Sequence, residues 1–183
     1  MHGISKTEQE VFTTVRKSLL SLWGRFKGLD GLEVVRSNNL TQQGRVTAPT
    51  LYMARGLTVP RGSPRDFTQW DRDAGRMVYR NVQVVEMEML LQAMVDMQCV
   101  NDARPGDVLN MASRIMQTSL FIRDIYKSGI QVLRIQDNKH TVITNDRDQY
   151  EAVPLLSVIF VYNEVLESEE PVIDSFNFKV RRV

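Results

Sequence analysis

Apolar and polar residues alternate along much of the chain, and the longest alternation spans residues 76–100. From Val85 onward the odd-numbered positions are apolar, whereas most charged and amide side chains, among them Glu86 and Glu88, take even-numbered positions. The same residue types also favour helices. The period of two is the longer match, however, and separates nearly every charge to one side. We therefore predict a strand, with a bulge where Val84 interrupts the alternation.

Two other segments show the spacing of amphipathic helices. Thr7 and Glu10 have the spacing of a capping box, and the apolar residues that follow predict a helix from about Thr7 to Phe26. Pro105 opens a second segment, which ends at Gly129, where a C-terminal cap belongs. A set of residues at helical spacing predicts one central helix. These residues are Val108, Met111, Ala112, Ile115, Ser119, Ile122 and Tyr126.

The segment 31–75 is predicted to be a long loop or arm, because proline, glycine and arginine dominate it. Within it, Leu32–Arg36 and Thr50–Arg55 are candidate short strands. A loop of this length is uncommon in a compact domain unless it has a function or pairs with a neighbour. We therefore consider it a candidate contact between subunits.

The last third of the chain reads mainly as strands. Ile130–Ile135 and 140–144 flank a polar turn at 137–139. Tyr150–Val165 is apolar on both faces, as expected of a central strand, and a further strand follows the turn at 168–171. Residues 1–183 are thus expected to form a single α+β domain. Its mostly antiparallel, twisted sheet would have about five to six strands, with an N-terminal and a central helix packed on it.

Bulk composition is that of an ordinary globular domain, with 183 residues, 43% of them hydrophobic and 25% charged. The net charge of +1 gives no global field that would attract nucleic acid or a membrane surface. The single cysteine, Cys99, has no partner for an internal disulfide, and no apolar run reaches the roughly 20 residues that span a bilayer. We expect a protein that is made and used in a cytoplasm-like setting.

Charge is unevenly distributed along the chain. Seven arginines and only three aspartates fall between Arg45 and Arg80, whereas five acidic residues lie within 164–174. Such patches are either solvated surfaces or the two sides of a head-to-tail contact between copies. With Trp70 and Tyr79 interleaved, the arginine-bearing segment suits either nucleic acid or a protein interface. The neighbouring aspartates and the near-zero net charge favour the interface.

Residues that could support catalysis or metal binding are few. His2, His140 and Cys99 do not make a convincing metal cluster or Cys–His pair. Glu86 and Glu88 would lie about 7 Å apart on one strand face. They form either a carboxylate pair for acid–base chemistry or, far more commonly, a solvated or interface-facing edge. No glycine-rich phosphate loop occurs. We predict no enzymatic activity, no metal and no cofactor.

The order of segments from Tyr79 to Val183 resembles the tail-terminator or neck-terminator proteins of tailed bacteriophages. An alternating strand ends in a polar turn, Asp102–Gly106 leads into a helix, and strands follow to the C-terminus. The most family-like details are Tyr150-Glu151 before the long strand and Tyr162 near its end. The resemblance rests on segment order and hydrophobic rhythm, without an invariant motif.

This resemblance implies a structural virion subunit that forms a ring, typically a hexamer, on the tail tube. The ring would stop tube polymerisation and join the tail to the head-side connector, and its lumen would be open to contact with exiting DNA. The protein would reside in the virion tail or neck, and in the host cytoplasm during assembly. Alternatives are another phage ring component (a head-completion, connector or tail-tube protein) or a nucleic-acid-binding module.

A closed ring joins two unlike patches of its subunits. Charge placement therefore predicts contacts between basic residues of one copy and acidic residues of the next. The basic residues are Arg61, Arg65, Arg72 and Arg76, and the acidic ones are Glu167, Glu169 and Glu170. Reversing Arg65 and Arg72 to glutamate is expected to block ring formation and leave a folded monomer.

Overall fold

The computed structural model describes most of the chain, and its description covers residues 5–25, 31–37, 48–71, 75–95, 104–144 and 150–169. Within 137–144 and 150–153, and at 169, it describes the backbone alone. Five strands form one mixed sheet: β1 (Glu33–Arg36), β2 (Thr50–Asp71), β3 (Arg76–Met94), β4 (Gln131–Thr144) and β5 (Tyr150–Glu169). The helices are α1 (Glu8–Trp23), α2 (Pro105–Met116) and α3 (Ser119–Lys127).

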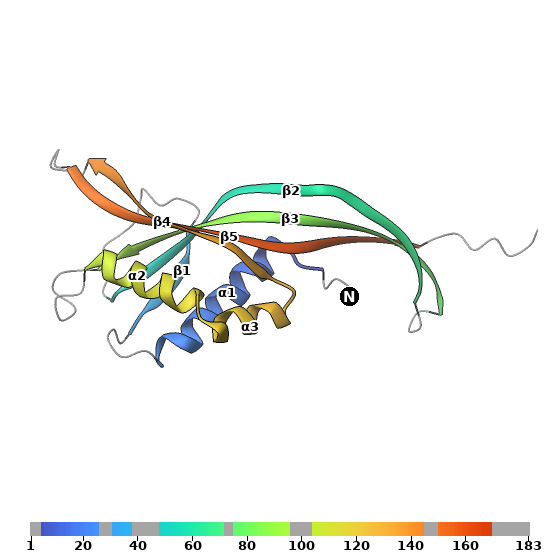
Figure 1. Ribbon diagram of the computed structural model, residues 1–183, viewed down its shortest axis with the longest axis horizontal. Helices are drawn as coiled ribbons and strands as arrows, with labels where there is room; N and C mark the ends of the chain where they lie inside the picture. The colour runs from blue at the N-terminus through green and yellow to red at the C-terminus, as the bar shows by residue number, and fades with distance from the viewer. Residues whose placement is uncertain are drawn as a thin grey trace, which may run out of the picture.

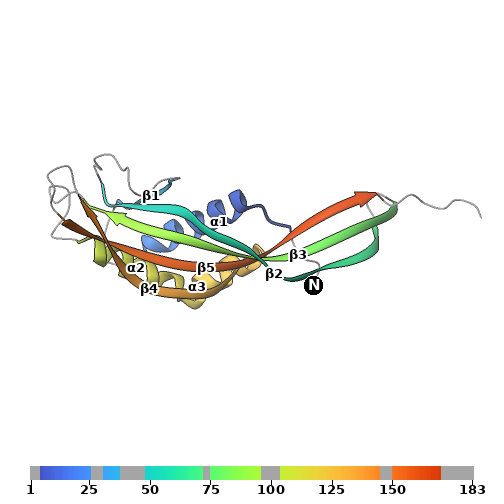
Figure 2. The same ribbon diagram turned by 90° about the horizontal axis from the view of Figure 1, so that it is seen from above.

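The sheet has the strand order β1-β2-β3-β5-β4 and is mostly antiparallel. Only β1 and β2 run parallel, whereas β2, β3, β5 and β4 form antiparallel pairs. All three helices lie against one face of the sheet (Figure 1). Seen from above, β2, β3 and β5 extend well past the helices (Figure 2). The predicted α+β class, with a twisted and mostly antiparallel sheet, is confirmed.

The hydrophobic core fills the space between the sheet and the helices. The odd-numbered side of β3 supplies Met87, Met89 and Leu91, all fully buried, as the alternation of the sequence predicted. Phe160 of β5 adds to the core from the sheet, and Leu19 of α1 adds to it from the helices. Burial of each such side chain contributes about 1.5–3 kcal/mol. The long strand and its buried face are thereby confirmed.

The N-terminal helix begins as its capping box predicts. The Thr7 backbone amide donates to Glu10 Oε2 at 2.7 Å, and the Glu10 amide donates to Thr7 Oγ1 at 3.3 Å. The helix is also tied to the sheet, because Arg16 Nε donates to the Val34 carbonyl oxygen at 2.7 Å. The predicted helix is therefore confirmed between Glu8 and Trp23, and residues 26–30 lie outside the described chain.

The predicted central helix is in fact two helices. α2 ends at Met116, and α3 starts after Thr118, whose hydroxyl accepts from the Phe121 amide at 3.2 Å and donates to the Ile115 carbonyl oxygen at 2.7 Å. This capping residue lets the chain change direction. As a result, Phe121 and Ile125 are buried in the core, whereas the predicted stripe residues Ile122 and Tyr126 are exposed.

The predicted loop within 31–75 is largely a strand. β2 continues through Pro60, Gly62 and Pro64. Along this stretch it pairs with β3 on one side, and its pairing with β1 ends at Met53. Prolines are tolerated on such an edge and at bulges, where no ladder amide is required. The pairing register shifts between Arg55 and Thr58 and again between Arg61 and Arg65.

Two smaller predictions also change. The bulge expected in β3 is absent from its pairing with β5, which is continuous from Val78 to Gln92; the irregularity lies instead in the facing part of β2. The turn expected at 137–139 is a register shift between Gln136 and Lys139 inside the continuous strand β4. The strand predicted after residue 171 lies outside the described residues.

Candidate functional site

The part of the sheet that extends past the helices is the candidate functional site. We call it the arm and define it as Leu57–Asp71 of β2, Arg76–Glu86 of β3 and Asn163–Glu169 of β5. These strands continue to the right of α1 and α3 and curve away at the hairpin between β2 and β3 (Figure 1). Residues Arg61–Thr68 of β2 are all exposed, in contrast to the buried first residues of the same strand. The helices therefore leave most of the arm uncovered, and only its base, at Val85, reaches the core.

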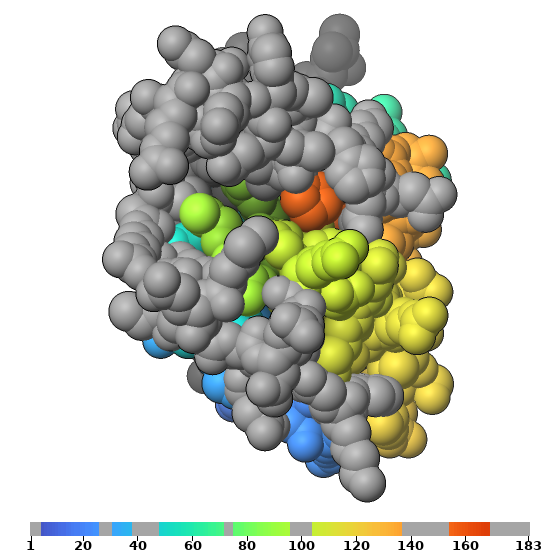
Figure 3. All heavy atoms as spheres, turned by 90° about the vertical axis from the view of Figure 1, so that its left-hand side faces the viewer, coloured from blue at the N-terminus to red at the C-terminus, as the bar shows by residue number. Residues whose placement is uncertain are grey.

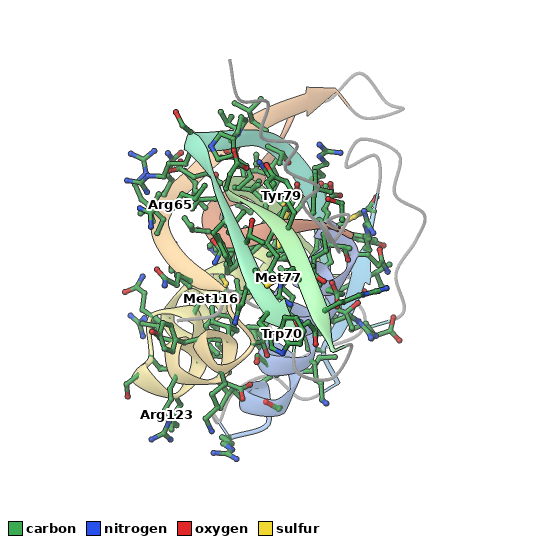
Figure 4. The ribbon with its side chains drawn as sticks, turned by 90° about the vertical axis from the view of Figure 1, so that its right-hand side faces the viewer. Arg65, Trp70, Met77, Tyr79, Met116 and Arg123 are labelled. Atoms are coloured by element: carbon green, nitrogen blue, oxygen red, sulfur yellow. The ribbon has the colours of Figure 1, made fainter. Side chains whose placement is uncertain are left out.

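The arm has two unlike faces, which follow from the strand register. The body face, on the same side of the sheet as the helices, carries Trp70, Met77 and Leu166, and the exposed fractions of Trp70 and Leu166 are 54% and 72%. In Figure 4, Trp70 and Met77 lie together near the hairpin end, and Arg65 lies apart from them. Trp70 and Met77 are register partners on adjacent strands and form one apolar patch, and Leu166 lies farther along the same face, opposite Asn81.

The outer face, on the opposite side of the arm, contains a hollow. Its volume is about 380 Å³ and it is formed around the register shift of β2, where Gly62 has a φ of +70°. The positive φ is readily adopted by glycine and lets β2 loop away from β3. The residues lining the hollow include three apolar side chains and two arginines: Arg61, Gly62, Ser63, Arg65, Phe67, Val82, Val84 and Asn163.

Polar contacts within the arm bind its three strands together. Arg61 Nη1 lies 2.9 Å from Glu86 Oε1, and Arg80 Nε lies 2.8 Å from Glu167 Oε1. Asn81 Nδ2 donates to Asp66 Oδ1 at 2.6 Å. Hydrogen bonds from the Tyr79 hydroxyl and then from Asn81 hold the pKa of Asp66 below its usual range. The arm is therefore internally braced even where no helix supports it.

The predicted interface residues are distributed over this arm in different ways. Arg61 and Glu167 have ion-pair partners within their own chain, Glu86 and Arg80. Arg65 is exposed beside the hollow, and no ion pair joins it to another described residue. Arg76 opens β3 and Glu169 closes β5, whereas Arg72 and Glu170 lie outside the described residues. Their contact between copies stays a prediction.

Glu86 and Glu88 share the outer face, as predicted, and each carboxylate has a partner at a register shift. Glu86 pairs with Arg61. Glu88 Oε1 accepts from Ser157 Oγ at 2.5 Å, and Glu88 Oε2 accepts from the Leu57 amide at 3.3 Å. The two side chains thus join β3 to β2 and β5. The sequence signal for this role is Gly56, which leaves space for the Glu88 side chain.

No metal-binding group of three or more histidine, cysteine or acidic side chains occurs in the described part of the chain. Cys99 and His2 lie outside that part, and of His140 only the backbone, in β4, is described. Among the described helices, none is both long enough and apolar enough to cross a membrane.

A second hollow, of about 170 Å³, lies at the corner between α1 and α3. Arg25, Arg123 and Lys127 line it together with Asp124, whose carboxylate accepts a hydrogen bond from Ser18. No ion pair joins these three cations to other described residues. This basic corner was not predicted from the sequence, because it forms only when two helices far apart in the chain meet. At the end opposite the arm, α2 and α3 make up much of the visible surface (Figure 3).

Comparison with known proteins places the chain in a family. The family described as E217 gateway protein gp29 matches residues 7–172, which include all three helices and all five strands. The chain belongs to this family. The gateway protein family is a bacteriophage structural family, so the predicted class of a phage virion protein involved in head–tail joining is confirmed in its coarse form. Family membership does not separate a terminator from other neck components. No curated protein matches the chain.

Proposed function

We propose that the protein is a ring-forming subunit of the phage neck that caps the tail tube, stops its polymerisation and joins the tail to the head-side connector. In this proposal the protein is a structural subunit and not an enzyme. Membership of the gateway protein family supports the neck location. The arm is the observation that supports a ring, because it presents two unlike exposed faces on one chain. Contacts between unlike patches join copies head-to-tail and close into a ring when the rotation between copies allows it.

The contacts of the charged side chains on the outer face also support an assembly role. Glu86 and Glu88, two carboxylates of the outer face, have structural partners across the strands. The charged residues that line the hollow on the arm are both arginines, Arg61 and Arg65. An exposed apolar surface on both sides of three strands is a feature of interaction sites in soluble proteins.

The test is to add the purified protein to polymerising tail-tube subunits of the same phage and to image the products by negative stain. A terminator is expected to form discrete rings, hexameric by native mass, and to shorten the tubes with one ring at an end. Tube subunits alone provide the control. Long tubes formed by the protein itself would reassign it to the tail-tube class. Rings that leave tube length unchanged would reassign it to the connector or head-completion class.

Contact between the ring and passing DNA is a further part of this proposal. The basic corner formed by Arg25, Arg123 and Lys127 supports it, since clustered cations attract the phosphate backbone. Affinity for double-stranded DNA is expected to fall steeply with salt, and the variant Arg123→Glu is expected to reduce the slope. The exposed Arg134→Glu on β4 is the matched control. Equal binding by both variants would rule out this corner as the contact.

A further inference from the structure

The arm carries an exposed apolar projection on its body face. Leu166, with 72% of its surface exposed, is the most exposed of the large hydrophobic side chains in the described part of the chain. It lies on β5 opposite Asn81, and Glu164 points to the same face two residues earlier. The segment 164–169 contains three glutamates and no basic residue. Of these three, only Glu164 shares the face of Leu166, because Glu167 and Glu169 take outer-face positions in the alternation. The projection is therefore a leucine with one carboxylate two residues away on the same face.

The outer face of the same arm offers a complementary hollow. Phe67, Val82 and Val84 give it an apolar part, and Arg65 and Arg61 supply guanidinium groups at its side. Arg61 is already neutralised by Glu86, whereas Arg65 has no ion pair with a described residue. The β2 segment from Arg55 to Arg65 contains three arginines and no acidic residue. An apolar side chain with a carboxylate beside it is complementary to this hollow in polarity and charge.

We propose that Leu166 of one copy inserts into the hollow between Phe67, Val82 and Val84 of the next copy, with Glu164 of the first copy facing Arg65 of the second. This inference rests on the proposed ring function and identifies the contact between its subunits. The occupant is a second copy of this chain, because the acidic-apolar projection and the basic-apolar hollow lie on opposite faces of one arm.

The geometry makes the contact head-to-tail. A self-complementary contact would require projection and hollow to lie on one face. The register of β3 and β5 is unbroken from the pair Val78–Glu169 to the pair Gln92–Leu155, so alternation puts projection and hollow on opposite faces. Stacked arms would bring two sheets together at about 10 Å, the usual distance between packed sheets. Each added copy leaves one projection and one hollow free, and the series ends only when a ring closes.

The first test uses two variants that each disable one side of the contact. Leu166→Arg removes the projection, and Arg65→Glu reverses the charge beside the hollow. Each alone is expected to weaken self-association by roughly ten- to a hundredfold, as measured by native mass spectrometry and sedimentation. The matched controls are Leu133→Arg and Arg134→Glu, exposed residues of β4 outside the arm, which are expected to assemble as the wild type does. Circular dichroism verifies that all four variants are folded.

Mixing the two variants gives the sharper result. For this mixture Leu166→Ser replaces Leu166→Arg, because an arginine at position 166 would face the glutamate introduced at position 65 and form a new ion pair. The Arg65→Glu chain keeps its projection and the Leu166→Ser chain keeps its hollow, so one intact contact remains between them. The mixture is expected to form a one-to-one dimer and nothing larger. Larger assemblies, or no association at all, would overturn the head-to-tail contact.

A charge exchange tests the proposed ion pair directly. Glu164→Arg alone is expected to weaken assembly, and combination with Arg65→Glu in one chain is expected to restore it, because the pair is then reversed on every interface. Failure of the double variant to recover would contradict the pairing of these residues. If the wild type forms rings and none of the arm variants affects them, the contact lies elsewhere and the ring function stands. If the wild type never associates, the ring function and the contact both fail.

Discussion

At the scale of single residues, the start of α1 shows the clearest agreement between sequence and structure. Thr7 and Glu10 exchange two hydrogen bonds that satisfy amides left free at the first turn of the helix. Replacing Thr7 by alanine is expected to lower the free energy of unfolding by about 1 kcal/mol. Urea denaturation measures this loss. The variant Thr14→Ala, in the middle of the same helix, is the control, and an equal loss there would contradict a capping role.

Glu10 also gives this helix a dependence on pH. Hydrogen bonds from the Thr7 amide and hydroxyl hold the pKa of Glu10 below its usual value. Its contribution to stability is thus fully present above the pKa of the unfolded chain and is lost as the pH falls through the lower folded pKa. The cost of Glu10→Ala is therefore expected to shrink in acid. Urea denaturation of the wild type and the variant at a series of acidic pH values measures this. A difference in free energy of unfolding that stays constant with pH would contradict a role for the charged form of Glu10.

At the scale of elements, the register shift at the base of the arm depends on a glycine and a carboxylate. A Cβ atom added at Gly56 would lie 2.6 Å from Glu88 Oε2 and 2.8 Å from Glu88 Cγ. Gly56→Ala is therefore expected to destabilise the fold by about 1–3 kcal/mol, as overpacking does. The penalty is expected to be smaller in a Glu88→Ala background, where these atoms are gone. A double-mutant cycle by urea denaturation measures the coupling, and additive effects would contradict it.

The start of α1 and the buried face of β3 could be predicted from short sequence patterns. The capping box of Thr7 and the alternation around Met87 and Met89 hold in the structure because neighbouring residues determine them. The break at Thr118 was missed since its hydroxyl cap competes with an apolar stripe that continues beyond it. The strand form of β2 was missed for another reason. Pro60 and Pro64 resemble a loop in the sequence, and only the one-sided pairing with β3 makes them compatible with a strand.

At the scale of the whole molecule, the candidate site depends on which surfaces the helices leave open. Trp70 and Leu166 belong to alternating patterns like those of the core, yet both are exposed because α1, α2 and α3 cover only part of the sheet (Figure 2). A sequence shows which face of a strand is apolar but not how far the covering layer extends. The arginines of the arm were recognised as candidates, whereas the projection of Leu166 and the hollow near Phe67 required the three-dimensional arrangement.

The unequal lengths of β2 and β3 have a consequence for the size of the assembly. β2 advances from Thr50 to Asp71 while β3 covers the same distance with three residues fewer, and the surplus is concentrated at the two register shifts. Two joined strands of different contour length bend, as the arm does in Figure 1. If copies stack through their arms, this bend sets the angle between neighbours. The diameter of the finished ring would then be encoded by a few additional residues in one strand.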